Sequence, residues 1–163
     1  MKWTSILFSA IGVFMVQFLL VDFLSLNMIR PDFLVVYIFY ISLVYGKTTG
    51  VFTGFLLGLL SDLSGVGSFF GLSPLSLSLT AYLTGYLNGK YERMLPYLFH
   101  GSWISIIGFH FIIISYVRFQ SILLSDPISF WIKCFMSFSY TMMFLLIIQF
   151  FYPVKEASHA EIN

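Results

Sequence analysis

Long runs of residues without charge dominate this chain of 163 residues and limit what it can fold into. Such runs cover residues 3–21, 33–46, 48–61, 63–89, 94–117 and 134–154, and most of their residues are apolar. About 20 apolar residues in a helix span the hydrocarbon core of a bilayer. With 59% hydrophobic residues, 9% charged residues and a mean hydropathy of +0.93, the composition lies outside the range of soluble domains. The sequence therefore predicts an integral membrane protein.

The predicted fold is an all-α bundle of six transmembrane helices that forms a single domain over residues 1–163. The first run follows a lysine but is longer than the apolar part of a signal peptide, so we expect a retained helix. The second and third segments are short, because 14 uncharged residues reach only about 21 Å as a helix. Lys47 could extend its amine to the interface, or the pair could form a re-entrant hairpin. We predict helices near residues 3–21, 32–45, 48–63, 72–89, 95–117 and 130–152, followed by a short mobile tail at 153–163.

The distribution of basic residues favours one orientation in the membrane. With the N-terminus inside, five basic residues lie on the cytoplasmic side and three on the outer side, as the positive-inside rule expects. Both termini are then cytoplasmic, and the four Asp residues lie at or near the outer face. The net charge is +1 without a basic cluster, so nothing indicates a nucleic acid partner. The cytoplasmic set is Lys2, Lys47, Lys90, Arg93 and Lys155, the outer set is Arg30, Arg118 and Lys133, and the acids are Asp22, Asp32, Asp62 and Asp126.

A stripe of glycines is the most informative local feature. Gly50, Gly54 and Gly58 recur at every fourth residue and lead to Asp62, which places them on one side of a helix. In hydrocarbon, helices associate by close packing through small residues and by a few polar contacts. We therefore interpret the stripe as a docking groove for another helix. Asp62 is then either a polar contact within the fold or with a partner, or a carboxylate at a helix end that faces water.

A second stripe, Ala81, Gly85 and Gly89, has the same spacing of four. If the two stripes pack on each other, both are used inside the molecule and neither is open to a partner. Upstream, Pro31 and Asp32 have the pattern of a helix start, with a proline near the first turn and an acid at the positive end of the helix dipole.

Sequence patterns give little support to catalysis. Asp32 and Asp62 could form a carboxylate pair, but Asp62 lacks the Gly-x-Gly-Asp signature of intramembrane aspartyl proteases. No serine lies in a Gly-x-Ser-x-Gly motif. The glycines between residues 65 and 71 lack the spacing and the lysine of a nucleotide-binding loop. We therefore predict a protein that is not an enzyme.

Metal and disulfide sites are also not indicated. His100 and His110 lie ten residues apart and have no acid or cysteine at ligand spacing, so both are interpreted as packing or hydrogen-bonding residues. Cys134 is the only cysteine, so it cannot form a disulfide within the chain. The sequence predicts no metal site and no cofactor.

Several motifs between residues 30 and 85 keep a recognisable order and spacing. They are Arg30-Pro31-Asp32-Phe33, the run Gly54-Phe55-Leu56-Leu57-Gly58-Leu59-Leu60-Ser61-Asp62, Gly65, Gly71-Leu72 and Ala81-Tyr82-Leu83. In this arrangement the stretch resembles the MreD family of rod shape-determining proteins.

The resemblance implies a multi-pass protein of the bacterial cell-elongation machinery in the inner membrane. In that machinery MreB filaments are coupled, through the single-span MreC and through MreD, to a RodA-type glycosyltransferase and a penicillin-binding transpeptidase. It also implies a six-helix fold similar to the S-components of energy-coupling-factor transporters. From the glycine stripe and the lack of a catalytic pattern, we predict a non-enzymatic scaffold whose small-residue grooves hold the transmembrane helix of an MreC-like partner. From the stripes and the resemblance, we expect structural or partner-interface roles for Pro31, Asp32, Gly50, Gly54, Gly58, Asp62, Gly65, Gly71, Ala81, Gly85 and Gly89.

The alternative is a substrate-binding membrane component of a vitamin-type transporter, in which residues 65–71 could cap an outward-facing pocket. A transporter site should gather polar groups at midplane depth. The helix centres offer little beyond serines, threonines and His110, which favours the scaffold.

Overall fold

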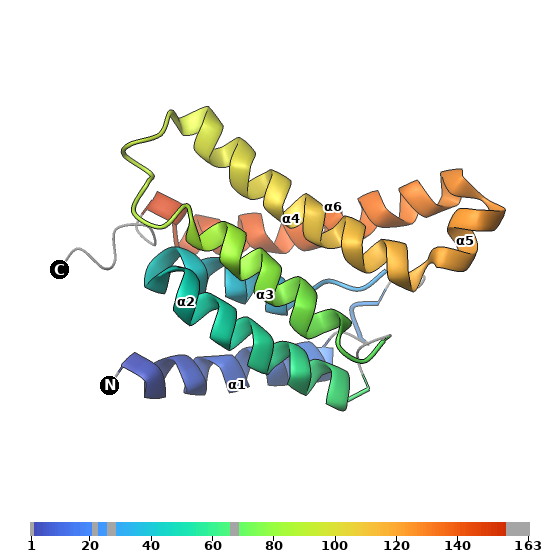
Figure 1. Ribbon diagram of the computed structural model, residues 1–163, viewed down its shortest axis with the longest axis horizontal. Coiled ribbons are helices and arrows are strands. Elements are labelled where there is room, and N and C mark those ends of the chain that lie inside the picture. Colours follow the sequence, from blue (N-terminus) through green and yellow to red (C-terminus); the bar gives the residue numbers. More distant parts are fainter. Residues whose placement is uncertain (1, 21–22, 26–28, 66–68, 156–163) are drawn as a thin grey trace.

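The computed structural model describes residues 2–20, 23–25, 29–65 and 69–155, and helices make up its regular structure (Figure 1). The all-helical prediction is confirmed. Asp22, residues 66–68 and the tail beyond residue 155 lie outside the described residues. The helices are α1 (Lys2–Leu20), α2 (Phe33–Leu63), α3 (Leu72–Gly85), α4 (Pro96–Arg118), α5 (Gln120–Ser125) and α6 (Pro127–Phe151).

Three of the described helices, α2, α4 and α6, are long and apolar enough to cross a membrane. In α1, residues 4–20 form a shorter apolar helix. Many large apolar side chains on the outer faces are exposed, including Phe8, Phe135 and Phe150. Hydrocarbon solvates such side chains as well as a protein interior does, so this surface is typical of a chain embedded in lipid.

Gly46 bends α2 sharply. Its φ of 79° and ψ of 178° lie outside the helical region, in a conformation that only glycine adopts without strain. The chain reverses direction there, and a Cβ atom on Gly50 in the second arm would overlap the Ser42 side chain in the first (Figure 1). The segments predicted at 32–45 and 48–63 are therefore two arms, 33–45 and 47–63, joined by one residue. At about 20 Å and about 26 Å, both arms are shorter than a bilayer core.

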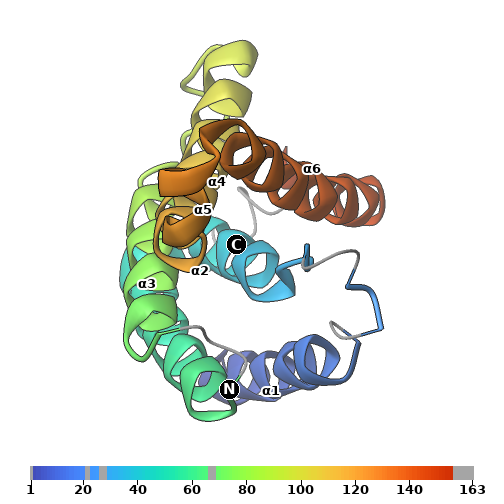
Figure 2. The ribbon, with the colours of Figure 1, turned by 90° about the vertical axis from the view of Figure 1, so that its right-hand side faces the viewer.

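The first arm of α2 forms the centre of the molecule (Figure 2). Val35, Ile38 and Phe39 on this arm are fully buried. The ring of Phe39 lies 5.3 Å from that of Trp103 on α4, measured between centroids. Leu145 of α6 is fully buried in the same apolar cluster. The shorter arm of α2 is thus the one that other helices enclose.

Residues 86–89 form turns and not the last turn of a helix, so α3 ends at Gly85, earlier than the predicted residue 89. Gly89 has a φ of 64°, which ends the helical path. The Asn88 side-chain amide donates to the carbonyl oxygens of Leu43 (2.5 Å) and Val44 (3.2 Å). These bonds cap the last carbonyls before the bend at Gly46 and tie the end of α3 to it.

The connection between α4 and α6 contains the short helix α5, where the sequence indicates a loop. α6 then begins at Pro127, three residues before the predicted residue 130. The Asp126 carboxylate accepts from the backbone N–H groups of Ile128 (3.2 Å) and Ser129 (3.3 Å), so the N-cap lies at residue 126.

Candidate functional site

Two glycines of the predicted groove, Gly54 and Gly58, lie against α3 of the same chain, whereas Gly50 lies against Ser42 on the first arm of α2. We call the contact with α3 the glycine seam: Gly54 and Gly58 on the second arm of α2, against Pro74 and Leu77 on α3. A Cβ atom on Gly54 would lie 3.1 Å from the carbonyl oxygen of Leu77, and one on Gly58 would overlap the backbone of Pro74. The two helices run antiparallel. Gly58 admits no side chain because the Pro74 backbone is too close, and a side chain at Gly54 would require the Leu77 backbone to give by a few tenths of an ångström.

The second stripe contributes to the same seam at its far end. A Cβ atom on Gly85 would overlap the backbone of Lys47, and Ala81 is fully buried. The face that the spacing predicted as a groove for another helix is therefore covered within the chain, as in the alternative where both stripes are used inside the molecule. Periodicity identified the closely packed face of α2, and packing against the helix with the second stripe was one of the two alternatives that the sequence left open.

Asp62 makes its contact within the fold. Its carboxylate accepts a hydrogen bond from the backbone N–H of Gly71, at 2.6 Å, and so closes the connection between α2 and α3. Gly65 and Gly71 both have positive φ angles, 74° and 93°. These two glycines end α2 and begin α3 with conformations that other residues adopt only with strain.

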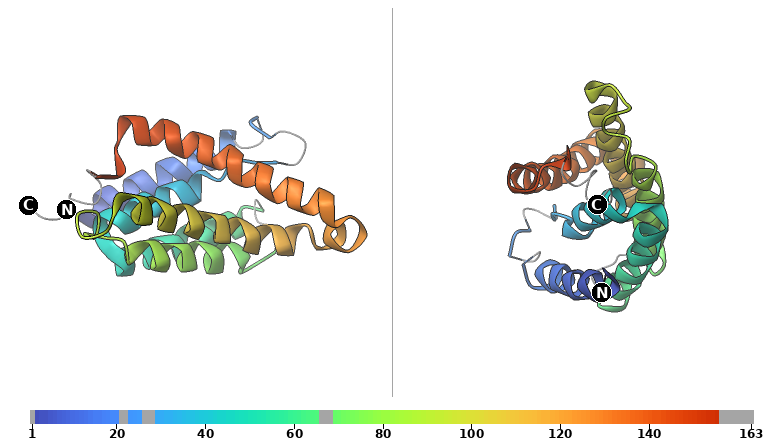
Figure 3. Two further views of the ribbon diagram at one scale, coloured as in Figure 1. Left: turned by 90° about the horizontal axis from the view of Figure 1, so that it is seen from above. Right: turned by 90° about the vertical axis from the view of Figure 1, so that its left-hand side faces the viewer.

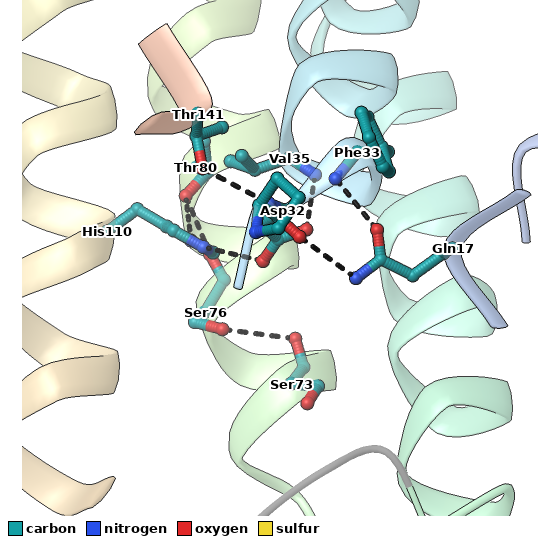
Figure 4. Close-up of polar contacts among 10 residues, drawn as sticks. Gln17, Asp32, Phe33, Val35, Ser73, Ser76, Thr80, His110 and Thr141 are labelled. Atoms are coloured by element: carbon teal, nitrogen blue, oxygen red, sulfur yellow. Dashed lines mark hydrogen bonds and ion pairs between the residues drawn. The ribbon is translucent and has the colours of Figure 1, made fainter. Parts of the chain in front are cut away.

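Polar side chains from several helices, most of them buried, lie together where α2 begins (Figure 4). We call Gln17, Asp32, Thr80, His110 and Thr141 the Asp32 cluster; they come from α1, the start of α2, α3, α4 and α6. One carboxylate oxygen of Asp32 accepts from the backbone N–H of Val35 at 3.1 Å, and the other lies 3.5 Å from Nε2 of His110. Asp32 is thus the N-cap of α2, as the sequence pattern predicted.

His110 is 1% exposed and bridges three helices. Its Nδ1 lies 3.1 Å from the Thr80 hydroxyl on α3, while its Nε2 faces Asp32. The Thr80 hydroxyl also donates to the carbonyl oxygen of Ser76 at 2.8 Å, so the contact is anchored within α3. His110 is a hydrogen-bonding residue, as expected, but its acidic neighbour is brought by the fold and is distant in sequence.

Gln17 and Thr141 hold the backbone that leads into α2. Phe33 donates its N–H to the Gln17 side-chain oxygen at 2.8 Å, and the Gln17 amide donates to the carbonyl oxygen of Pro31 at 3.4 Å. Asp32 donates its N–H to the Thr141 hydroxyl at 3.1 Å. Sequence reasoning missed both side chains. Gln17 could have been noticed, because it is the only amide side chain in the run 3–21.

A small cavity of about 40 Å³ adjoins the Asp32 cluster. This volume admits water but is far below that of a pocket for a vitamin-sized molecule. Its lining is mixed, with two cationic side chains and several hydroxyl and apolar groups: Gln17, Arg30, Pro31, Asp32, Phe111, Ile114, Ser115, Arg118, Phe119 and Ser137.

The acids and histidines that the sequence singled out contact several different groups. Asp32 and Asp62 have different partners, His110 and Gly71, so they do not share a proton. His100 accepts from the indole N–H of Trp103 at 2.9 Å. In the part of the chain that the structure describes, no three His, Cys, Asp or Glu side chains gather as metal ligands.

Comparison with known proteins identifies the family. The family model of the rod shape-determining protein MreD matches residues 1–156, almost the whole chain. No curated protein and no solved structure matches, so the likeness to transporter S-components stays a prediction. Together with the long apolar helices, the match supports the resemblance seen between residues 30 and 85. The chain belongs to the MreD family.

Proposed function

We propose that this protein is a non-enzymatic scaffold that connects the MreB and MreC system to lateral peptidoglycan synthesis. Membership of the MreD family implies a role in rod-shape determination, within the machinery that includes MreC and MreB. In the proposal, the protein binds the transmembrane helix of an MreC-like single-span protein. Through that complex it joins a RodA-type glycosyltransferase and a penicillin-binding transpeptidase, with MreB filaments as indirect partners.

An apolar groove between α1 and α6 is the observation on which this proposal rests. We call it the α1–α6 groove; the first arm of α2 forms its floor, and its volume is about 290 Å³. Figures 2 and 3 show α1 and α6 on either side of that arm. The lining is almost entirely apolar and consists of Val13, Val16, Phe33, Val36, Tyr37, Tyr40 and Ile148.

The tyrosine hydroxyls in this groove already have acceptors within the chain. Tyr37 donates to the carbonyl oxygen of Ile6 at 2.9 Å, and Tyr40 donates to that of Tyr152 at 3.1 Å. The groove therefore offers ring edges and methyl groups, without an unsatisfied polar atom on either tyrosine. A membrane helix that packs by van der Waals contact suits such a surface. Because α3 covers the glycine seam, we assign the partner helix to the α1–α6 groove.

We also propose a multi-pass topology in the inner membrane with both termini in the cytoplasm. The start of α1, the bend at Gly46 and the connection from α3 to α4 lie at one end of the molecule, and α5 lies at the other (Figures 1 and 3). The first end carries Lys47, Lys90 and Arg93, in line with the positive-inside rule.

The transporter alternative finds less support. A vitamin site requires several hundred cubic ångströms with converging polar groups. The polar cavity beside Asp32 has about 40 Å³, and the α1–α6 groove is apolar. A hollow of about 460 Å³ with charged side chains, including Glu92, Arg93 and Lys155, lies at the connection between α3 and α4 and not among the helix centres.

Co-purification with the MreC-like protein of the same host tests the scaffold proposal. Val16→Trp places an indole in the α1–α6 groove, and we expect recovery of the partner in mild detergent to fall about ten-fold, the effect of roughly 1.4 kcal/mol. Ile104→Trp is the matched control, because Ile104 on α4 is 39% exposed and Val16 is 40% exposed. Equal recovery with both variants would contradict the assignment of the groove. Tight binding of a vitamin-sized solute by the purified protein would favour the transporter.

A further inference from the structure

A second groove lies on the outer side of the glycine seam. We call it the Lys47 groove; it has a volume of about 590 Å³ and runs between the second arm of α2 and α3. Unlike the α1–α6 groove, it has a charged residue in its lining. The lining residues are Lys47, Thr48, Val51, Phe52, Phe55, Ser78 and Tyr82.

The charged end of this groove carries two ammonium groups on a pair of tyrosines. The Lys47 Nζ atom lies 5.0 Å from the ring centroid of Tyr86 and 6.0 Å from that of Tyr82. Lys90 places its Nζ atom 5.8 Å from the Tyr86 centroid. The two tyrosine hydroxyls are hydrogen-bonded to each other at 2.7 Å. Aromatic rings hold ammonium groups in place without neutralising them, so the site keeps its positive charge.

The charge lies at one end of the helix pair and the apolar surface extends away from it. Lys47 directly follows the bend at Gly46, and its backbone abuts Gly85 at the end of α3. Phe55 is eight residues further along the same arm, about 12 Å away. Lysine and tyrosine at the end of a membrane helix are typical of the headgroup level. The groove therefore combines a cationic site at that level with an apolar trench that enters the hydrocarbon.

We propose that the Lys47 groove binds an anionic glycerophospholipid. The phosphate accepts from the ammonium groups of Lys47 and Lys90, and one acyl chain lies along Val51, Phe52 and Phe55. A zwitterionic phosphatidylethanolamine suits the site less, because its own ammonium group meets two lysines. An apolar partner helix would cover the trench but would bring no counterion for either charge. This site is independent of the scaffold function, because the partner helix is assigned to a different face.

Quenching by brominated lipid tests the proposal on the inserted, full-length protein. Phe55→Trp places a reporter in the trench, and its emission is measured against the parent protein in vesicles with brominated acyl chains. The brominated lipid is phosphatidylglycerol or phosphatidylethanolamine at equal mole fraction. Each basic residue near a membrane surface favours an anionic lipid about five-fold, so we expect phosphatidylglycerol to bind about 25-fold more tightly. When Lys47→Gln and Lys90→Gln are added to Phe55→Trp, the two lipids should quench the tryptophan reporter equally.

Lys133→Gln is the matched control for the loss of a lysine. The Lys133 Nζ atom lies 5.4 Å from the ring centroid of Phe119, so it makes the same kind of contact at another place. Selectivity in this variant should equal that of the Phe55→Trp protein. Three outcomes would each overturn the proposal. In the first, Lys133→Gln loses as much selectivity as the variant without Lys47 and Lys90. In the second, both lipids quench the Phe55→Trp protein equally, and in the third, selectivity survives the loss of both lysines. Should Phe55→Trp not fold, native mass spectrometry of the parent and lysine variants counts retained phosphatidylglycerol, with the same expected order.

Discussion

Asp32 and His110 face each other at the start of α2, with 3.5 Å between the carboxylate Oδ2 atom and Nε2. The contact joins the N-cap of the central arm to the middle of α4, and Thr80 extends it to α3. Polar contacts between membrane helices are retained where the alternative is an unsatisfied group in hydrocarbon. The position of the central arm therefore depends on this contact as well as on apolar packing.

Replacement of His110 by Leu tests that dependence. We expect a loss of about 2–3 kcal/mol in the free energy of unfolding, because the Asp32 carboxylate keeps its charge and loses a partner. The loss stays below that of a fully buried pair, since 22% of the Asp32 side chain is exposed. Chemical unfolding in detergent measures it. His100→Leu, which removes only an acceptor for Trp103, should cost about 1 kcal/mol or less. Equal losses in the two variants would contradict a special role of the Asp32 contact.

Gly58→Ala should destabilise the protein by about 1–3 kcal/mol, because the new methyl group overlaps the Pro74 backbone and neither backbone can withdraw without opening the seam. Gly12→Ala on α1 is the control: a Cβ atom there meets nothing within 4 Å, and alanine favours a helix by up to about 1 kcal/mol. Thermal unfolding midpoints of the two variants should move in opposite directions. If Gly58→Ala left the free energy of unfolding unchanged, the glycine seam would have to widen freely.

Asp62→Asn should be milder than Gly58→Leu. The Asn side-chain oxygen can still accept from the Gly71 N–H, whereas Leu at residue 58 blocks the approach of α3. A cell-shape assay in the host measures both, with the fraction of rod-shaped cells as the readout and the protein level in the membrane as the control. Equal severity of the two variants would mean that the charge of Asp62 itself matters.

The N-cap of α6 should make stability depend on pH. Hydrogen bonds from the Ser129 hydroxyl and backbone, followed by that from Ile128, hold the pKa of Asp126 below its usual value of 3.8. A carboxylate with a lowered pKa in the folded state stabilises fully above its unfolded pKa, and this contribution is lost as the pH falls through the folded value. Unfolding of parent and Asp126→Asn should therefore differ above about pH 4 and converge below it. A constant difference at every pH would exclude the ionised cap.

The positions of the long helices could be predicted from the sequence, because they depend on hydropathy alone. The runs at 94–117 and 134–154 exceed what a bilayer requires, and α4 and α6 lie close to their predicted ranges. Asp32 could also be assigned in advance, since a helix start depends on a few neighbouring residues. Local signals of this kind do not depend on the rest of the fold.

The contacts between helices could not be predicted in the same way. The spacing of Gly54 and Gly58 identifies a face, but any helix with a close backbone could cover it, and α3 does. His110 and Asp32 belong to different helices, and hydropathy carries no information on which polar groups meet. The sequence places Gly46 in a loop before Lys47, because nothing in it reveals that one residue suffices for the reversal.

The bend at Gly46 also has a mechanical consequence. A junction of one residue cannot lengthen. On the α3 side, the Asn88 amide is hydrogen-bonded to the residues before it, and the backbone of Gly85 packs against the residue after it. We expect a sliding displacement of the first arm along its axis to displace the second arm and α3 as well. A partner that pulls on the floor of the α1–α6 groove would then also shift the opposite face of the molecule.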